Sequence, residues 1–431
     1  MCGIVGITHS KTAALDVFKG MLLLQHRGQD SAGILSYNSD SKRFRLEKGL
    51  GLATQVFSKE SLNELEGTSA IGHTRYSTVG KIYESDVQPL LENFPYGIGA
   101  VHNGNVCNTD ELRKEVLASD RYLSSNNDLE ILIHLLGQGL VLGLQNNKSD
   151  FFSVLIKSVQ NIFNNCKGGY SFISLIAGKG LVAFRDPHGI RPLIMGKKEE
   201  STIFCSETNV LNFLGYEFVR DILPGEVVWI DENNQFHSEV LSQFSPRPCM
   251  SEWVYFSSAE SSWHGKNMYQ VRLDLGRLLG KKIKELNLDI DLVAPVPDTS
   301  RSAAIALAEV LALPYREILM KNRYVQRSFI LNTQEKRREA VNLKFSVVQE
   351  LVRAKKILLV DDSIVRGTTS EKIIELLQHY GAEKIYFAST CPPIKHPCSY
   401  GIAFPKKEEL LSNGLNIDEM ATKLGIPSYT S

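Results

Sequence analysis

The stretch KILLVDDSIVRGTTS, from Lys356 to Ser370, decides the fold of the second half of the chain. Its apolar, β-branched run from Ile357 to Val360 predicts a strand that is buried on both faces, as in a parallel sheet. The carboxylates Asp361 and Asp362 stand where this strand ends, and a short loop follows them. Glu371 to Tyr380 then carries apolar residues at helical spacing. Because ligands of open parallel sheets bind beyond the carboxyl ends of the strands, this loop is predicted to hold a ligand.

The chemistry of the loop limits which ligands it can bind. Backbone N–H groups from Ser363 to Thr369, with the positive end of the following helix dipole, would suit a phosphate. The two carboxylates would repel a phosphate alone. They fit a ligand that also carries hydroxyls, a bound Mg²⁺, or a carbon that becomes cationic. For an isolated pair of aspartates, a Rossmann-like strand and turn with solvated acids is the plainer alternative.

The complete run is similar to the phosphoribosylpyrophosphate (PRPP) signature of type I phosphoribosyltransferases, in its amidophosphoribosyltransferase form. The resemblance implies an α/β domain with a mainly parallel sheet. It also implies that Ser300 ligates Mg²⁺ together with the two aspartates. The residues that it places around PRPP are Asp361, Asp362, Ser363, Arg366, Gly367, Thr368, Thr369 and Lys321.

The segments upstream of this run fit such a domain. Met268 to Leu286 is predicted to be an amphipathic helix and Ile290 to Val296 a buried strand. The loop from Pro297 to Ser302 opens a helix; its hydroxyls and N–H groups would suit pyrophosphate, although an ordinary N-cap explains the same residues. Lys321 to Lys344 holds seven Lys or Arg against two Glu. A solvated basic face usually explains such a cluster, whereas the resemblance implies a mobile loop that closes over PRPP and excludes water.

The N-terminus, MCGIVGI, predicts a second site. Removal of Met1 would give Cys2 a free α-amine, whose pKa of about 7.7–8.0 lets it act as a base for its own thiol. Four further polar segments lie beside apolar runs, the usual place for site residues. They are Gln25–Asp30 (QHRGQD), Gly72–Thr78 (GHTRYST), His102–Asn105 (HNGN) and Asn127–Glu130 (NDLE).

Together with the N-terminus, these segments resemble the glutaminase domain of class II, N-terminal-nucleophile amidotransferases. The resemblance implies an α+β fold, an αββα sandwich, in which Cys2 attacks the side-chain amide of glutamine. Asn103 and Gly104 would then hold the oxyanion, Arg75 the substrate α-carboxylate and Asp128 its α-amine. An amide that becomes tetrahedral needs donors aimed at the developing charge, and a zwitterion needs one cation and one carboxylate. Taken alone, Arg75 or Asp128 would more simply be half of a surface ion pair.

His26, His73 and His102 lie near these segments and are interpreted as structural hydrogen-bonding residues, because the α-amine already supplies a base. Gln243 to Cys249 (QFSPRPC) holds two prolines and no periodicity, and it predicts a domain boundary. The predicted domains are therefore a glutaminase domain over residues 2–243 and a phosphoribosyltransferase domain over residues 250–431.

Several positions depart from the amidophosphoribosyltransferase pattern. Ser257 to Ser261 (SSAES) replaces a charged ARPDS-like stretch, Asn332 stands where proline is common, and the chain stops at Ser431, earlier than most relatives. Some members hold an iron–sulfur cluster on four cysteines. Cys249 and Cys398 occupy only two of those positions, so no cluster is predicted.

Composition sets the remaining expectations. Lys plus Arg equals Asp plus Glu at 48 each, so no nucleic-acid or membrane partner is expected and any anion site is local. The seven scattered cysteines lack a C-x-x-C pair, and no signal peptide is recognisable, which predicts a cytoplasmic, reduced protein. The resemblance further implies a homo-oligomer that purine nucleotides inhibit.

The two resemblances together imply an amidophosphoribosyltransferase activity, which converts glutamine and PRPP to phosphoribosylamine, glutamate and pyrophosphate at the first committed step of purine synthesis. Two alternatives stay open. One is a class II amidotransferase that transfers ammonia to another acceptor. The second half of the sequence argues against it, because it lacks an S-G-G-x-D-S nucleotide loop and a paired sugar-isomerase repeat. The other is a catalytically weakened paralogue that binds PRPP or nucleotides as a regulator.

Overall fold

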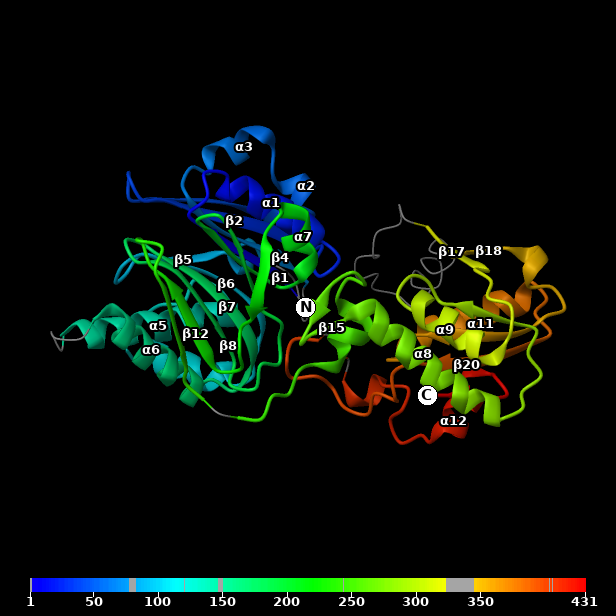
Figure 1. The fold of residues 1–431 in the computed structure, drawn as a ribbon. Coiled ribbons are helices and arrows are strands. Elements are labelled where there is room, and N and C mark those ends of the chain that lie inside the picture. The colour runs from blue at the N-terminus through cyan, green and yellow to red at the C-terminus, as the bar shows by residue number, and fades with distance from the viewer. Residues whose placement is uncertain are drawn as a thin grey trace. The chain divides into compact units, whose positions relative to one another are not determined.

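The computed structural model describes residues 2–76, 83–119, 121–145, 150–242, 244–322, 345–402, 404 and 406–431. The chain divides into two compact units (Figure 1). The first holds Met1–Cys249, Glu260–Gly265 and Cys398–Ala403, and the second holds Met250–Ala259, Lys266–Pro397 and Phe404–Ser431. Three features of the sequence, Gln243, Asn332 and most of the basic segment from Lys321 to Lys344, lie outside the described residues.

Two antiparallel sheets form the centre of the first unit. In the described chain, the first sheet has the order β11-β9-β10-β1-β4-β2-β3 and the second the order β13-β12-β8-β7-β6-β5. The strands of the first sheet are β1 (Gly3–Thr8), β2 (Ser31–Asn38), β3 (Arg43–Leu50), β4 (Ser69–Arg75), β9 (Ile194–Lys198), β10 (Ser201–Cys205) and β11 (Glu217–Asp221). Those of the second are β5 (Leu90–Glu92), β6 (Ile98–Val106), β7 (Gly168–Ile176), β8 (Gly180–Arg185), β12 (Glu226–Ile230) and β13 (Phe236–Val240).

Successive side chains along each strand point to opposite faces of its sheet, and this alternation accounts for the layers of the unit. On β1, Ile4 joins the apolar cluster that the inner faces of both sheets share, whereas Val5 joins the cluster under the helices. Figure 1 shows α1 and α7 beside the first sheet and α5 and α6 beside the second. The unit is therefore the expected αββα sandwich. Its helices are α1 (Ala13–Leu23), α2 (Ala53–Val56), α3 (Lys59–Glu64), α4 (Thr109–Ala118), α5 (Asp128–Gln145), α6 (Phe151–Asn165) and α7 (Thr208–Leu214).

A parallel sheet forms the centre of the second unit, with the order β16-β19-β20-β21. Its strands are β16 (Leu292–Pro295), β19 (Lys356–Asp361), β20 (Lys384–Ser389) and β21 (Tyr429–Thr430). The run from Ile357 to Val360 is buried on both faces as predicted, because Ile357 and Leu359 enter one apolar cluster while Leu358 and Val360 enter another. These clusters also take side chains from α8 (Met268–Glu285), α9 (Arg301–Leu311), α11 (Thr368–His379) and α12 (Ile417–Leu424). The expected α/β domain with a mainly parallel sheet is confirmed.

Short elements complete the second unit. They are a π-helical turn at Glu252–Phe256, β17 (Leu319–Lys321), which pairs with β18 (Phe345–Val347), single 3₁₀ turns at Gln349–Leu351 and Lys407–Glu409, and the strand β15 (Lys266–Asn267). The strand β14 (Ser262–Trp263) and the 3₁₀ turn Glu84–Asp86 belong to the first unit. Among the described helices, none has the length and apolar character that crossing a bilayer requires.

Candidate active site

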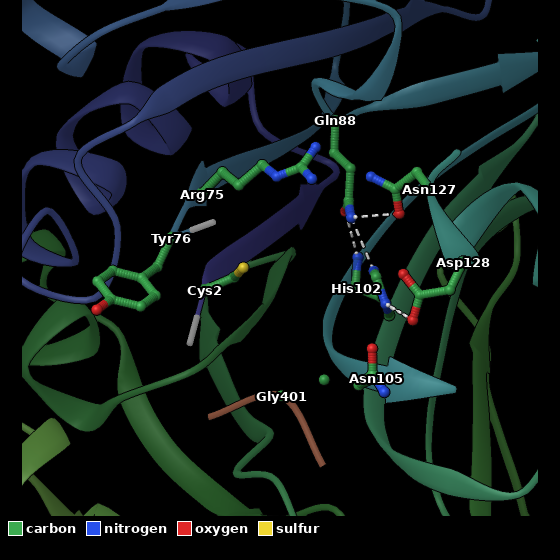
Figure 2. A pocket seen from close by; sticks show the side chains of 10 residues that line it. Cys2, Arg75, Tyr76, Gln88, His102, Asn105, Asn127, Asp128 and Gly401 are labelled. Carbon is green, nitrogen blue, oxygen red and sulfur yellow. Dashed lines mark hydrogen bonds and ion pairs between the residues drawn. The ribbon is translucent and has the colours of Figure 1, made fainter. Parts of the chain in front are cut away.

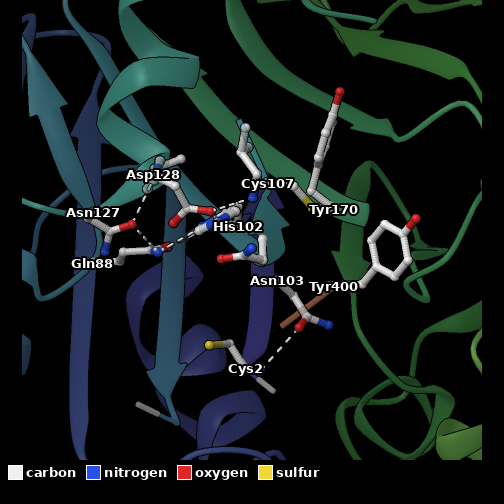
Figure 3. Close-up of polar contacts among 12 residues, drawn as sticks. Cys2, Gln88, His102, Asn103, Cys107, Asn127, Asp128, Tyr170 and Tyr400 are labelled. Atoms are coloured by element: carbon white, nitrogen blue, oxygen red, sulfur yellow. Dashed lines mark hydrogen bonds and ion pairs between the residues drawn. The ribbon is translucent and has the colours of Figure 1, made fainter. Parts of the chain in front are cut away.

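Cys2 precedes β1, a central strand of the first sheet, and two residues hold it, of which Figure 3 shows Asn103. Its backbone nitrogen donates a hydrogen bond to Oδ1 of Asn103 at 3.1 Å. Its carbonyl accepts one from Nε of Arg27, also at 3.1 Å. One residue further, the N–H of Ile4 donates to Oγ of Ser206 at 3.0 Å. The start of the chain is therefore fixed by residues from three separate segments.

A buried ion pair supports this arrangement. Arg27 is 1% exposed, and its guanidinium hydrogen-bonds Glu207, which is equally buried. Glu207 also accepts from Nε2 of His26 at 2.9 Å and from Oγ of Ser261 at 2.9 Å. Burial disfavours the charged carboxylate, but the charges and hydrogen bonds of His26 and Arg27 outweigh burial and hold the pKa of Glu207 far below its ordinary value. Glu207 is therefore an anion that keeps Arg27 aimed at Cys2.

Asn103 and Gly104 lie on β6, and they carry the features that an oxyanion site needs. Asn103 is fully buried, and in the described part of the chain its Nδ2 has no hydrogen-bond partner. A buried amide donor without a partner costs free energy, so a ligand acceptor at this position would recover it. Gly104 has φ +154°, and a Cβ there would lie 2.0 Å from the carbonyl oxygen of Gly169 on β7. Only glycine fits this position.

A pocket opens beside the thiol of Cys2 (Figure 2). Arg75 reaches it from the end of β4, and its guanidinium donates to the carbonyl of Asp86. Gly28 allows the necessary approach of two loops, because a Cβ at Gly28 would lie 2.5 Å from the carbonyl carbon of Arg75. The lining residues are Cys2, Arg75, Tyr76, Gln88, His102, Gly104, Asn105, Asn127, Asp128 and Gly401.

Asp128 opens α5 at the opposite side of this pocket from Arg75 (Figure 2). Its Oδ2 accepts from the N–H of Val106 at 2.8 Å and pairs with Nε2 of His102 at 3.1 Å. Burial opposes both charges, but their mutual attraction and hydrogen bond outweigh it, so the pKa of Asp128 is lowered and that of His102 is raised. Both of these hydrogen bonds fall on Oδ2, and Oδ1 takes part in neither of them.

The structure adds residues to this site that sequence patterns did not indicate. Nε2 of Gln88 lies 2.8 Å from Nδ1 of His102, and Oε1 of Gln88 accepts from the backbone N–H of His102 at 2.8 Å. His102 is thus a structural hydrogen-bonding residue, as interpreted from the sequence.

His73 is fully buried, and burial, followed by the charges of its neighbours, holds its pKa well below the ordinary value. It is therefore a neutral core residue.

The second unit brings the two predicted PRPP loops to one edge of the parallel sheet. Pro295 at the end of β16 pairs in register with Val360 on β19, so both loops leave the carboxyl ends of adjacent strands. Ser363 donates its hydroxyl to Oδ1 of Asp362 at 2.8 Å. Burial is the largest influence on Asp362 and raises its pKa to about 6, although Ser363, Arg272 and Thr299 act to lower it.

The loop after Asp362 is fixed by its backbone. The carbonyl of Asp362 accepts from the N–H of Cys391 at 2.9 Å, and the N–H of Leu411 donates to the carbonyl of Val365 at 2.9 Å. Gly367 has φ +81° and precedes the first turn of α11. The side chains that could face a ligand, Arg366, Thr368 and Thr369, are exposed, and Arg366 pairs with Glu409 at 2.9 Å.

The other predicted residues of this site are engaged with the protein. The hydroxyl of Ser300 is buried and donates to the carbonyl of Val296, while its lone pairs remain for a ligand. Lys321 donates to Asp298 at 2.7 Å, and Arg301 donates to the same carboxylate at 2.6 Å. Burial opposes the charge of Asp298, but these two cations outweigh it and lower its pKa. A ligand that binds Lys321 would compete with Asp298.

Comparisons with known proteins bear on both sites. A glutamine amidotransferase domain matches residues 73–212, and a phosphoribosyl transferase domain matches residues 265–401. The amidophosphoribosyltransferase of Haemophilus influenzae is 42% identical over 99% of this chain and 86% of its own length. That of Escherichia coli is 40% identical over 99% of this chain and 85% of its own length. A solved glutamine PRPP amidotransferase from B. subtilis, complexed with ADP and GMP, has a TM-score of 0.88 at 34% identity, covering 100% of this chain and 90% of that one.

The fold and the two matched domains define an enzyme class, the transferases that join a glutamine amidotransferase to a phosphoribosyltransferase. The similarity to the two bacterial relatives extends over both halves and nearly the whole chain. The chain therefore belongs to the amidophosphoribosyltransferase family, as the motifs at its two ends predicted.

Proposed function

We propose that this chain transfers the amide nitrogen of glutamine to PRPP, giving phosphoribosylamine, glutamate and pyrophosphate, at the entry to purine synthesis. The observation that carries the proposal is the buried Nδ2 of Asn103, which has no partner among the described residues and belongs to the same side chain that holds the nitrogen of Cys2. An acyl-transfer site needs such a donor beside its nucleophile.

The first half-reaction is assigned to the pocket beside Cys2. With Met1 removed, the backbone nitrogen of Cys2 becomes an α-amine that donates to Asn103 and keeps its lone pair for the thiol proton. The thiolate forms a bond to the side-chain carbonyl carbon of glutamine, and Nδ2 of Asn103 with the N–H of Gly104 stabilises the oxyanion. The C–N bond breaks, ammonia leaves with the proton from the α-amine, and water releases glutamate from the thioester.

Substrate orientation is assigned to two charged side chains of the same pocket. Arg75 binds the α-carboxylate of glutamine, and Asp128 binds its α-ammonium group through Oδ1. Two lining residues of opposite charge, held from different elements, support this assignment because they fit a zwitterion in one orientation. Since His102 and Val106 occupy Oδ2, Asp128 is already held in place before the substrate binds.

The second half-reaction is assigned to the loops at the edge of the parallel sheet. Ammonia attacks C1 of PRPP, the new C–N bond forms, and the C–O bond to pyrophosphate breaks with its electrons on the leaving group. The backbone from Ser363 to Thr369 and the side chains of Arg366 and Lys321 bind the phosphates. Asp361 and Asp362 hold the ribose hydroxyls and face the carbon that becomes cationic.

The residues at this edge also fit a magnesium ion. Asp361, Asp362 and Ser300 offer oxygen ligands, and Asp362 and Ser300 are buried, so they can exclude water from a bound ion. We infer that these three residues hold Mg²⁺, which when bound neutralises charge on the departing pyrophosphate. No iron–sulfur cluster is assigned, since Cys249 and Cys398 supply only two of the four ligands that such clusters take.

Three further expectations belong to this proposal. Inhibition by purine nucleotides is supported by the B. subtilis relative, which was solved with ADP and GMP. A cytoplasmic location fits the seven cysteines, which form no disulfide within the described chain. A homo-oligomer and the domain limits, residues 2–243 and 250–431, are also proposed. The predicted site residues are present in both halves of the chain, which argues against the alternative of a catalytically weakened paralogue.

The test is a stoichiometric assay of the purified chain with glutamine, PRPP and Mg²⁺. Glutamate and pyrophosphate should form in equal amounts, and the label of [amide-¹⁵N]glutamine should enter phosphoribosylamine. Glutamine hydrolysis without pyrophosphate release would instead support a regulator or another acceptor.

A further inference from the structure

A short segment from the second half of the sequence forms part of the glutaminase pocket. Cys398–Ala403 belongs to the first unit, although the chain on both sides of it belongs to the second. Gly401 lines the pocket together with Cys2 (Figure 2), and Gly104 is a further lining residue. The glutaminase fold itself ends near Cys249, so this segment is an addition from a distant part of the chain.

The segment holds the end of β6 through its backbone. The carbonyl of Ser399 accepts from Nδ2 of Asn105 at 2.9 Å and from Sγ of Cys107 at 3.0 Å. The carbonyl of Tyr400 accepts from the guanidinium of Arg191, which is fully buried. Two of these bonds fix the segment to Asn105 and Cys107, which follow the predicted oxyanion residue Gly104, and the segment contributes a backbone oxygen to all three.

Gly401 makes the closest approach to the oxyanion strand. Its φ is +91°, and a Cβ there would lie 3.0 Å from the carbonyl oxygen of Gly104 and 3.1 Å from its carbonyl carbon. Such distances are shorter than ordinary van der Waals contact, so a side chain at position 401 would push the peptide that follows Gly104. Displacements of well under 1 Å matter at an oxyanion site, because its donors are aimed at one position.

We propose that Ser399 to Gly401 is a positioning element for glutamine hydrolysis, which holds Gly104 and Asn105 where the oxyanion forms, and that glycine is required at position 401. Gly401 and Ser399 touch the strand rather than the reacting atoms, so their role is positioning. The proposal rests on the proposed function of Cys2, Asn103 and Gly104.

The primary test compares Gly401→Ala with Gly414→Ala in the full-length protein. Gly414 has φ +71°, and an added Cβ there meets no atom within 4 Å, so this control carries the same kind of backbone strain without the contact. We expect Gly401→Ala to lower kcat for glutamine hydrolysis by about 10- to 100-fold with little change in KM. Ammonia-dependent phosphoribosylamine synthesis should stay at the wild-type rate in both variants.

A second pair of variants keeps the test decisive if Gly401→Ala does not fold. Cys107→Ala removes the Sγ donor to Ser399, and Cys107→Ser restores a donor. Glutamine-hydrolysis kcat should fall severalfold in the first and recover in the second. The proposal is overturned if Gly401→Ala behaves like Gly414→Ala, if both activities fall in proportion, or if both Cys107 variants match the wild type. Asn103→Asp serves as reference: full glutaminase activity in that variant would refute the assigned oxyanion site itself.

Discussion

Oδ1 of Asn103 accepts a hydrogen bond from the backbone nitrogen of Cys2 at 3.1 Å, across 101 residues of sequence. The other end of the same amide, Nδ2, is buried and has no partner within the described chain. One side chain therefore holds the catalytic nitrogen and presents a donor beside the thiol.

Asn103→Asp separates these two roles. The substituted carboxylate keeps an acceptor for the nitrogen of Cys2, but it removes the donor and places negative charge where the oxyanion forms. We expect kcat for glutamine hydrolysis to fall on the order of 10²–10³. Steady-state glutaminase assays measure this effect, with Asn164→Asp, an exposed amide on α6, as the control. A loss confined to KM would contradict the oxyanion assignment.

Processing of the N-terminus provides a second prediction. If the α-amine of Cys2 is the base, retention of Met1 converts it to an amide that cannot accept a proton. A preparation with an uncleaved N-terminal extension, verified by mass spectrometry, should lack glutaminase activity while its thiol remains. It should still make phosphoribosylamine from ammonia. Full glutaminase activity in this preparation would show that another group is the base.

Glu207→Gln tests the buried pair behind Cys2. The substitution keeps the shape of the side chain but deprives buried Arg27 of its carboxylate, and breaking such pairs costs about 3–5 kcal/mol. We expect that loss in the free energy of unfolding, together with reduced glutamine hydrolysis, because Arg27 donates to the carbonyl of Cys2. Asp274→Asn, which breaks an exposed pair with Arg277, should cost no more than about 1 kcal/mol by denaturant titration. Equal costs for the two variants would refute a supporting role for Glu207.

The His102–Asp128 pair predicts a pH dependence of stability. The pKa of His102 is raised, so its contribution is fully present below the unfolded value of about 6.5 and is lost as pH rises through the folded pKa. The pKa of Asp128 is lowered, so its contribution is present above the unfolded value of about 3.9 and is lost as pH falls through the folded pKa. The pair therefore stabilises the fold most at a pH between the unfolded-state pKa values of Asp128 and His102.

The measurement compares the free energy of unfolding of the wild type and His102→Gln at pH 6 and pH 8. The difference between the two proteins should shrink as the pH rises through the folded pKa of His102, because the ring then loses its charge. His379→Gln, at an exposed histidine on α11, is the control. A difference that stays constant or grows with pH would show that the pair is not charged in the folded protein.

The sequence predicted what depends on local pattern. The run from Ile357 to Val360 indicated a strand with two buried faces, and the observed strand β19 extends one residue further at each end. The pattern from Glu371 to Tyr380 indicated a helix, and the observed helix α11 begins three residues earlier, at Thr368, and ends at His379. The αββα layers came from resemblance, since alternation along β1 identifies two faces but not which sheet covers each face.

Contacts between distant segments could not be predicted in this way. Glu207 joins Arg27 across 180 residues, and Ser399 joins Asn105 across 294. Gln88 is an ordinary amide in a turn by sequence, yet it holds His102 through two hydrogen bonds. Periodicity reports which face of an element is buried, whereas these partners depend on how the sheets and loops meet.

The most direct test of two separate sites on one chain is a reciprocal comparison of Cys2→Ala with the double variant Asp361→Asn/Asp362→Asn. Glutamine hydrolysis, glutamine-dependent synthesis and ammonia-dependent synthesis are measured with saturating PRPP and Mg²⁺. Cys2→Ala should lose glutamine hydrolysis and keep ammonia-dependent synthesis. The double variant should keep basal glutamine hydrolysis and lose both syntheses, on the order of 10²–10³ or more in rate. Near-wild-type synthesis in the double variant, or equal loss of every activity in Cys2→Ala with the fold intact, would contradict the account.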